Sequence, residues 1–466
     1  MNKNLLKHFR SGNLTVQERM ANGKAVRRIV SRSQLGDYKP PADRADPVSI
    51  LEEQGKTRLA ALVPIRYARM LTSQFAFLRG GAAIMARDLA ESATTGINVQ
   101  ACGDMHLANF GVFASAERKL IFGINDFDET LPGPWEWDLK RLVASIVASG
   151  RFLGAGSRVC KQSVKAAVRS YQKRMKEYAY MGNLELWYST ITEKDISKTL
   201  SDKQLAAFKK ITSKARERTH LQVLGKLTDL VGDKYRLKEN APFIVRETHS
   251  EKGVPIEQAL GELLESYFDS LNDDRKNLLR HYRIVDVARK VVGVGSVGTR
   301  CWIIFFVGNN ADDPLFLQVK EAQPSVLESV IAESKYKNHG QRVVAGQRLI
   351  QGAPDIFLGW GEHHGNHFYV RQLRDMKGGV EFDPAKKSLE NFSEYCSLCA
   401  WAMALAHARS GDAAMISGYI GSSDELEEAM IRFAFAYADQ TETDHQALVN
   451  AAKSGRIKVA KTESDE

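Results

Sequence analysis

The sequence lacks any long hydrophobic run. Its longest, residues 301–307, is far shorter than the about 20 apolar residues that cross a bilayer as a helix. The first residues carry several charges and no apolar core of the kind found in a secretory signal. Cysteine is also scarce. The 5 cysteines form an odd and sparse set, which favours a reducing compartment over disulfides. We therefore expect a cytoplasmic protein without a membrane segment.

Acidic residues are outnumbered by basic ones. Lys and Arg total 65 against 56 Asp and Glu, which gives a formal net charge of +9. This excess suits anionic ligands, but it is only a weak indication of nucleic acid. Much of it falls within 151–238, where basic residues recur between apolar ones as on the solvated face of a helix. No alternation of aromatic and basic residues that would stack on bases is visible there, so we do not expect a nucleic-acid partner.

Two acidic motifs about twenty residues apart are the most informative feature of the sequence. Asp104 follows a predicted short strand, and Asn109 stands five positions later. Asp126 and Asp128 follow a second predicted short strand. In phosphoryl transfer, one Asp can orient the attacking hydroxyl while an Asn and a later Asp hold Mg²⁺ against the nucleotide phosphates. The plainer alternative is a pair of loop carboxylates that cap turns.

A glycine-rich segment is the second informative feature. Gly293, Gly295 and Gly298 precede a strongly β-prone stretch over 301–307. A dinucleotide-binding glycine motif would lead from a strand into a helix, so this context argues against that class of site. It favours a hairpin loop folded over phosphates, whose backbone N–H groups can approach the phosphate oxygens because glycine has no Cβ. An ordinary hairpin is the plainer alternative.

The strand predicted after this hairpin ends at Lys320, which could supply a cation to the α- and β-phosphates. We expect a helix to start after Pro324 and Ser325. It would carry Glu328 and Glu333, either of which could hold Lys320 in place, and the sequence does not choose between them. A solvated lysine at a strand end is the plainer alternative.

These residues resemble the protein-kinase-like superfamily, especially its aminoglycoside phosphotransferase and choline kinase branch. The catalytic loop of that branch reads G-D-x-H-x-x-N, which is matched here by Gly103, Asp104, His106 and Asn109. Its metal-binding Asp follows a short strand, as Asp126 does. Its later Asp, which braces the catalytic loop, resembles Asp138. The resemblance implies that His106 braces the loop through hydrogen bonds.

The resemblance also implies roles for the acidic residues. Asp104 would accept or orient the proton of the substrate hydroxyl. Asn109 and Asp126 would be Mg²⁺ ligands, and Asp128 would bind a second ion or act beside the first. ATP and Mg²⁺ are the cofactors that this assignment requires, with Lys320 and the glycine loop at the phosphates.

Nearly the whole chain also resembles an uncharacterised bacterial family that is known only by a domain-of-unknown-function label. The segment 75–141, with LRGGAAIMA and NDFDETLPGPWEWDLKRL, carries this match most clearly. This resemblance implies no activity by itself. Arg79 lies in the segment and could contact phosphate, but we expect it to form a structural salt bridge.

The order of the motifs departs from that of kinases, because the glycine loop and Lys320 follow the catalytic loop instead of preceding it. We therefore expect an α+β, two-lobed kinase-like fold that is circularly permuted, with a small antiparallel sheet lobe and a larger, mainly helical lobe. Permutation is tolerable because chain ends commonly lie at the surface. The expected parts are a basic arm (1–50), the catalytic-loop part of the large lobe (51–150), a basic helical region (151–282), the small β lobe (283–375), a helical part of the large lobe (376–450) and a charged tail (451–466).

Two other functions remain open. A metal-dependent phosphoesterase would use Asp104 with His106 and the later motif ending at His367, although Asp126 and Asp128 have the wrong spacing for that class. A non-catalytic nucleotide-binding protein would bind ATP without turnover. The sequence favours an ATP- and Mg²⁺-dependent phosphotransferase, with a nucleotide and an unidentified small-molecule or protein hydroxyl acceptor as partners.

Overall fold

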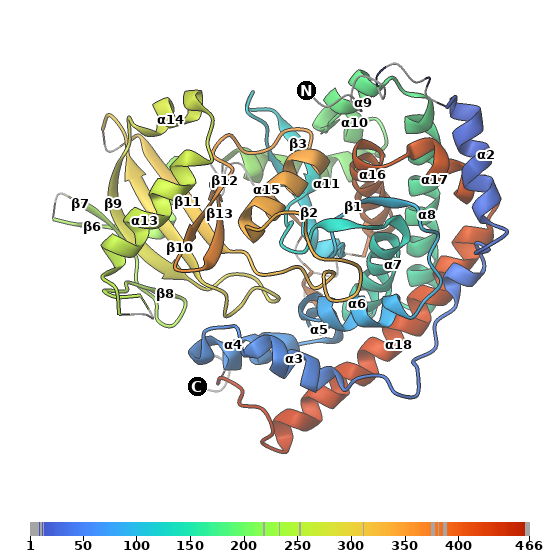
Figure 1. The fold of residues 1–466 in the computed structure, drawn as a ribbon, viewed down its shortest axis with the longest axis horizontal. Helices are drawn as coiled ribbons and strands as arrows, with labels where there is room; N and C mark the ends of the chain where they lie inside the picture. The colour runs from blue at the N-terminus through green and yellow to red at the C-terminus, as the bar shows by residue number, and fades with distance from the viewer. Residues whose placement is uncertain are drawn as a thin grey trace.

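The computed structural model describes residues 9, 12, 14–217, 220–232, 234–250, 253–310, 312–373, 378–380, 382–384 and 389–461. These residues form a mixed α+β protein in which a sheet-rich part lies beside a larger helical part (Figure 1). Its sheets are antiparallel, as expected. Within the described residues, every helix is too short or too polar to span a lipid bilayer.

The elements follow one another in a mixed order. The strands are β1 (Asn98–Ala101), β2 (Phe110–Ala114), β3 (Leu120–Ile124), β4 (Leu131–Pro134), β5 (Ile191–Thr192), β6 (Thr228–Val231), β7 (Lys234–Leu237), β8 (Ile244–Val245), β9 (Arg283–Lys290), β10 (Cys301–Val307), β11 (Pro314–Glu321), β12 (Gly359–His363) and β13 (Asn366–Gln372). The α-helices are α2 (Val16–Val26), α3 (Pro47–Gly55), α4 (Val63–Leu71), α5 (Gln74–Gly80), α6 (Ala82–Ala90), α7 (Trp135–Phe152), α8 (Ser157–Tyr180), α9 (Asn183–Tyr188), α10 (Glu193–Ser197), α11 (Asp202–Glu217), α12 (His220–Leu227), α13 (Ile256–Asp269), α14 (Asp273–Leu279), α15 (His339–Ile350), α16 (Phe392–Ser410), α17 (Ala413–Ile420) and α18 (Glu425–Lys453). Short 3₁₀ helices lie at η1 (Gln34–Gly36), η2 (Ala60–Leu62) and η3 (Leu107–Asn109).

The largest sheet has the strand order β12-β13-β11-β10-β9-β8. Its central strands read as nearly continuous apolar runs because both faces of the sheet are covered. Ile304 and Leu317 pack in one cluster with residues of α13, whereas Phe305 and Phe316 pack in another with residues of α12. The alternation of side chains along each strand therefore sends successive residues to two different hydrophobic clusters.

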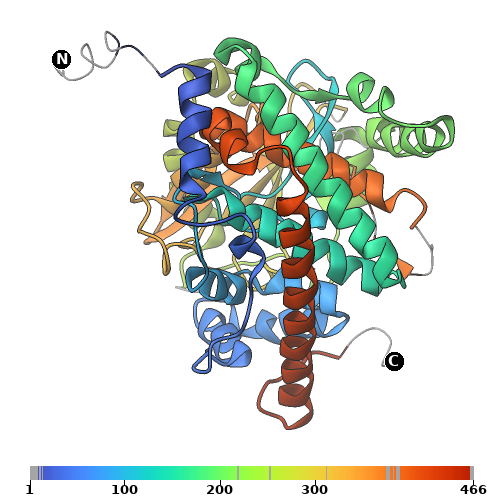
Figure 2. The same cartoon turned by 90° about the vertical axis from the view of Figure 1, so that its right-hand side faces the viewer.

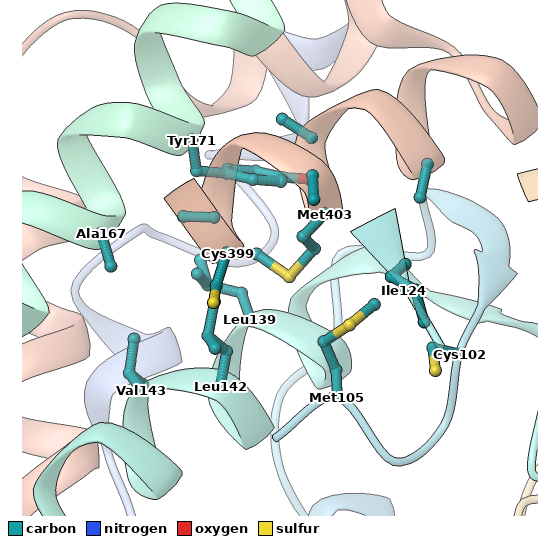
Figure 3. Packing of buried hydrophobic residues seen from close by; sticks show 14 of the residues in the cluster. Cys102, Met105, Ile124, Leu139, Leu142, Val143, Ala167, Tyr171, Cys399 and Met403 are labelled. Carbon is teal, nitrogen blue, oxygen red and sulfur yellow. The ribbon is translucent and has the colours of Figure 1, made fainter. Parts of the chain in front are cut away.

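The helical part is built around α7, which is buried at every residue from 135 to 150. Leu139, Leu142 and Val143 are completely buried, and Figure 3 shows them close to Cys399 and Met403 of α16. Cys396 and Cys399 are free thiols that are buried in this core. Segments more than two hundred residues apart thus share one hydrophobic core.

The polar, basic sequence of the N-terminal arm is typical of a loosely packed segment, but its described part is packed. Figure 2 shows α2 lying beside α17. A Cβ on Gly23 would come within 1.9 Å of the Met415 carbonyl oxygen, and one on Gly418 within 2.1 Å of the Met20 carbonyl oxygen. Glycines on both helices therefore allow the two backbones to touch. The remaining parts of the arm and tail lie outside the described residues.

The prediction of a helix starting after Ser325 was wrong. Glu328 accepts a hydrogen bond from the Ser325 backbone N–H, which is the pattern of a helix start, but it also accepts one from Ser334 N–H and so closes a compact turn. The helix begins later, at α15, where the side chain of Asn338 caps the Gln341 N–H. Ile350 is the last residue of this helix, although its apolar surroundings in the sequence are typical of a strand.

The burial of Leu142 in the core allows the effect of one substitution on stability to be predicted. Replacing Leu142, which is completely buried in α7, with alanine should lower the free energy of unfolding by about 2–5 kcal/mol, because a cavity replaces lost contacts. Denaturant unfolding measures this change. Leu184→Ala is the control, since Leu184 is 71% exposed and its loss should change stability little. Equal effects of the two substitutions would contradict this account of the core.

Candidate active site

The loop that carries Asp104 leaves β1, which pairs with β4. Gly103 begins the loop with a φ of +79°, a conformation that side chains other than glycine rarely adopt. A Cβ at Gly103 would also lie only 2.5 Å from the Glu129 carbonyl oxygen. Glycine is therefore required both for the backbone conformation and for the close approach of the second acidic segment.

A buried carboxylate holds this loop in place. Asp138 of α7 accepts hydrogen bonds from the backbone N–H groups of Cys102 (2.7 Å) and Gly103 (3.0 Å). His407 Nε2 of α16 lies 3.2 Å from Asp138, and the Tyr171 hydroxyl of α8 lies 2.7 Å from His407 Nδ1. The expectation that Asp138 braces the loop agrees with these contacts, which also connect the loop to two helices of the core.

Asp104 faces the cleft beside a buried arginine. Arg141 donates to Asp104 Oδ1 from Nε (2.9 Å) and Nη2 (2.7 Å), and His106 Nε2 lies 3.5 Å from Oδ2. Burial raises the pKa of Asp104, and the Arg141 charge opposes this rise. Burial, with the nearby arginines, holds the pKa of His106 well below its ordinary value, so its ring is neutral. Asn109 donates its amide to the Asp104 carbonyl (2.6 Å).

The late segment reaches the early one through Lys320. Its ammonium group contacts Asp128 and lies 3.6 Å from Asp126 Oδ1, although 192 residues separate Lys320 from Asp128. The Tyr369 hydroxyl donates to the other oxygen of Asp128 at 2.7 Å. Lys320 is 2% exposed. Burial opposes its charge, but Asp126 and Asp128 outweigh burial and raise the pKa of Lys320. Lys320 is therefore a buried cation held by two carboxylates.

Helix α15 supplies an arginine where we expected a glutamate. Arg342 donates to the carbonyl oxygens of Asp128, Thr130 and Gln323, each at 2.8 Å, and so fixes the turn behind the acidic motif. Glu328 lies 3.5 Å from Arg342, and it lies on the turn described above. The carboxylates at Lys320 are those of Asp126 and Asp128, so pairing of Lys320 with Glu328 or Glu333 was the wrong assignment.

The glycine loop covers the cleft and is held by two arginines. Gly293 and Gly298 have φ values of +68° and +95°, so both adopt conformations that favour glycine. Arg69 donates to the Gly293 carbonyl, and Arg58 donates to the Val297 carbonyl at 2.6 Å. A Cβ on Gly295 would lie 3.1 Å from the Arg79 carbonyl oxygen. The loop therefore lies directly against the segment that contains α4 and α5.

Both halves of the predicted site meet at one cleft of about 950 Å³, part of which is open to solvent. Of the predicted site residues, those that line it are Asp104, His106, Asn109, Asp126, Asp128, Gly293, Gly295 and Arg79. Lys320 lies behind Asp126 and Asp128, and Gly298 rests on the side chain of Arg58. Hard oxygen donors of the kind that Mg²⁺ prefers are thus gathered on one wall, from Asn109, Asp126 and Asp128.

Several residues at this cleft were missed from the sequence. Arg58, Arg66 and Glu129 line it, and Arg342 and Tyr369 hold its acidic wall. Glu129 directly follows Asp128, so its position could have been noticed. The others come from segments without a recognisable motif, and only their packing brings them to the site.

The expected salt bridge of Arg79 is absent among the described residues, and its Nε is buried without a hydrogen-bond partner there.

The fold and cleft thus define a mixed α+β protein with an acidic loop cluster beneath a glycine loop. The chain belongs to a bacterial family described as an uncharacterized protein conserved in bacteria (DUF2252), which matches residues 58–451. That range contains every residue that lines the cleft except Gln54. No curated protein and no solved structure is similar enough to match.

Removal of the Asp138 carboxylate should have both a local and a global effect. Asp138→Ala should lower the free energy of unfolding by about 1–3 kcal/mol or more, because two buried N–H groups lose a charged acceptor. Denaturant unfolding measures the loss, and amide exchange at Cys102 and Gly103 should become faster. Asp439→Ala, which removes an exposed ion pair with Arg151, is the control and should change stability by less than about 1 kcal/mol. Unchanged exchange at the two amides would contradict the bracing role.

The buried carboxyl of Glu129 should make the stability of the protein depend on pH. Burial is the largest cause that raises the pKa of its carboxyl from 4.5 to about 7. Because the folded protein binds this proton more tightly, the stabilisation is complete below about pH 4.5 and is lost as the pH rises to about 7. Glu129→Gln should therefore gain stability relative to the original protein across this interval, as measured by unfolding at several pH values. Exposed Glu185→Gln is the control. A difference that is independent of pH would refute the shift.

Proposed function

We propose that this protein is an ATP- and Mg²⁺-dependent phosphotransferase with a circularly permuted kinase-like fold, acting on a hydroxyl acceptor that is not identified. One observation carries the proposal: Lys320 meets Asp126 and Asp128 on the wall of a cleft that also contains Asp104 and the glycine loop. These are the groups that phosphoryl transfer requires for binding phosphates, holding metal and orienting a nucleophile.

The connectivity of the large sheet supports the kinase-like part of the proposal. The glycine loop joins β9 to β10, and Lys320 lies on the next strand, β11. Helix α15 follows, and then β12 and β13. Protein kinases have the same succession of glycine-rich loop, lysine strand and helix. One difference is that the lysine is held by Asp126 and Asp128 instead of a glutamate on the helix.

The end of α16 supports the permutation. Ser410 Oγ accepts a hydrogen bond from the Gln100 backbone N–H at 3.1 Å. A Cβ on Gly411 would lie 2.7 Å from a methyl carbon of Val99 and 3.0 Å from the Asn98 carbonyl oxygen. The end of the helix that follows the sheet therefore touches the start of the strand that leads to Asp104. Joining the chain there would give the motif order of an ordinary kinase.

The residues of the cleft have distinct roles in this proposal. Asp104 accepts the proton of the acceptor hydroxyl while Arg141 fixes the orientation of its carboxylate. Lys320 would supply positive charge to the phosphates from behind Asp126 and Asp128, and the backbone of the glycine loop would contact them from the cleft. Asn109 and Asp126 would hold Mg²⁺. The bound ion would neutralise charge on the transferred phosphoryl group.

The phosphoesterase alternative receives less support. It needs His367 beside Asp104, but His367 lies on β13 and accepts a hydrogen bond from the His339 N–H through its ring. Among the described residues that line the cleft, His367 is not present. A nucleotide-binding protein without activity has the same cleft, so the experiment below must measure binding and turnover separately.

Two substitutions test the proposal. Lys320→Met should weaken ATP binding or transfer by at least about tenfold, roughly 1.4 kcal/mol. Asp104→Ala should abolish turnover while MgATP affinity stays within about twofold, since Asp104 acts on the acceptor. Calorimetric titration with MgATP and assay of ADP release give the two quantities.

Exposed Lys119→Met is the matched control for removal of one ammonium group, and it should change neither quantity. If the original protein fails to bind MgATP, the proposal is wrong. If it binds but has no turnover with any hydroxyl acceptor, the non-catalytic alternative replaces it. Phosphatase activity supported by Mn²⁺ or Zn²⁺ without nucleotide would favour the phosphoesterase.

A further inference from the structure

Three arginines line the cleft without belonging to any motif of the proposed nucleotide site. Arg58 lies between α3 and α4, Arg66 lies in α4 and Arg79 lies in α5. Asp104 lines the same cleft. The arginines therefore form a basic wall next to the proposed catalytic base, on elements that carry neither Lys320 nor the acidic motifs.

The guanidinium groups of this wall are incompletely paired. Arg66 is 1% exposed, and its Nη2 donates to Gln54 Oε1 (2.8 Å) and the Gly80 carbonyl (3.0 Å). Its Nε and Nη1 are buried and have no hydrogen-bond partner among the described residues. The same holds for Nε of Arg58 and Nε of Arg79. Buried donors are nearly always paired in proteins, so four unpaired nitrogens around one cleft indicate a missing acceptor.

Burial and nearby charges both act on the three arginines. Burial lowers the pKa of the Arg66 guanidinium, and the positive charge of nearby Arg58 lowers it further. Burial lowers the pKa of Arg79 as well, against the attraction of Asp104 and Asp126. Glu129, Glu321 and Asp128 act on Arg58 with opposite charge, and Glu129 acts on Arg66. None of these carboxylates accepts a hydrogen bond from the unpaired nitrogens among the described residues. An oxyanion offers oxygens to several guanidinium forks at once, which is how arginine binds carboxylates and phosphates.

We infer that Arg58, Arg66 and Arg79 form a binding site for an anionic group, a carboxylate or phosphate, of the acceptor substrate. The existence of the anion site stands on the unpaired arginines, whereas its assignment to the acceptor rests on the proposed function. In that function Mg²⁺ and Lys320 already meet the charge of the nucleotide phosphates. An acceptor held by the arginine wall would present its hydroxyl to Asp104 in the same cleft.

Anion binding without nucleotide tests the inference. Inorganic phosphate and succinate are titrated into the full chain in the presence of EDTA, with calorimetry and thermal stabilisation as readouts. At least one of the two probes should bind, and the tighter one identifies the class of group. Arg79→Gln and Arg66→Gln should each weaken that binding by at least about tenfold. Lys119→Met should leave it unchanged.

Arg66 is deeply buried, so circular dichroism must first show whether Arg66→Gln is folded. If it is unfolded, the more accessible Arg79→Gln decides the test. The same variants are titrated with MgATP. Loss of anion binding with MgATP affinity kept within about twofold supports an acceptor site. An equal loss of both would overturn it and assign the arginines to the nucleotide. Absence of binding by both probes at millimolar concentration would overturn the anion site, whereas MgATP binding by the original protein would still support the proposed function.

Discussion

The contact of Lys320 with Asp126 and Asp128 is the interaction on which the arrangement of this protein depends. It joins the large sheet to the loop that follows β3, across 192 residues of sequence. Lys320 is 2% exposed, whereas Asp126 and Asp128 are 35% and 26% exposed, so the ion pair must offset mainly the lost hydration of the lysine, and additional hydrogen bonds help it to do so. The Tyr369 hydroxyl supplies one to Asp128, and Arg342 holds the backbone on the far side of the same turn.

A second buried carboxylate has the equivalent role on the helical side. Asp138 joins the Asp104 loop to α7, and His407 and Tyr171 extend this connection to α16 and α8. The cleft is therefore bounded by one wall anchored in the sheet and another anchored in the helical core. Both anchors are charged groups in dry surroundings, where each unmade hydrogen bond is costly and the geometry is correspondingly well fixed.

Sequence patterns located the residues of the cleft better than the architecture around it. Asp104, Asn109 and Asp126 could be grouped because their spacing is typical of phosphoryl-transfer sites, and they line one cleft with Gly293 and Gly295, which were recognised because they precede an apolar strand. The prediction of a helix that carries Glu328 was wrong because this pattern, typical of a helix start, closes a turn instead. The turn depends on contacts with distant residues, which the sequence does not reveal. Arg58, Arg66 and Arg342 could not be assigned from the sequence, because only tertiary packing gives an isolated arginine its surroundings.

The position of Lys320 has a consequence for the order in which the cleft could be filled. Asp128 now shares its oxygens between an ammonium group and a phenol, so a divalent ion approaching alone would compete with a lysine that is already in place. Under the proposed function, a triphosphate would offer that lysine a replacement partner and free the carboxylate at the same moment. Metal and nucleotide would then bind as one complex, and Lys320 would keep other cations from this carboxylate until that complex arrives.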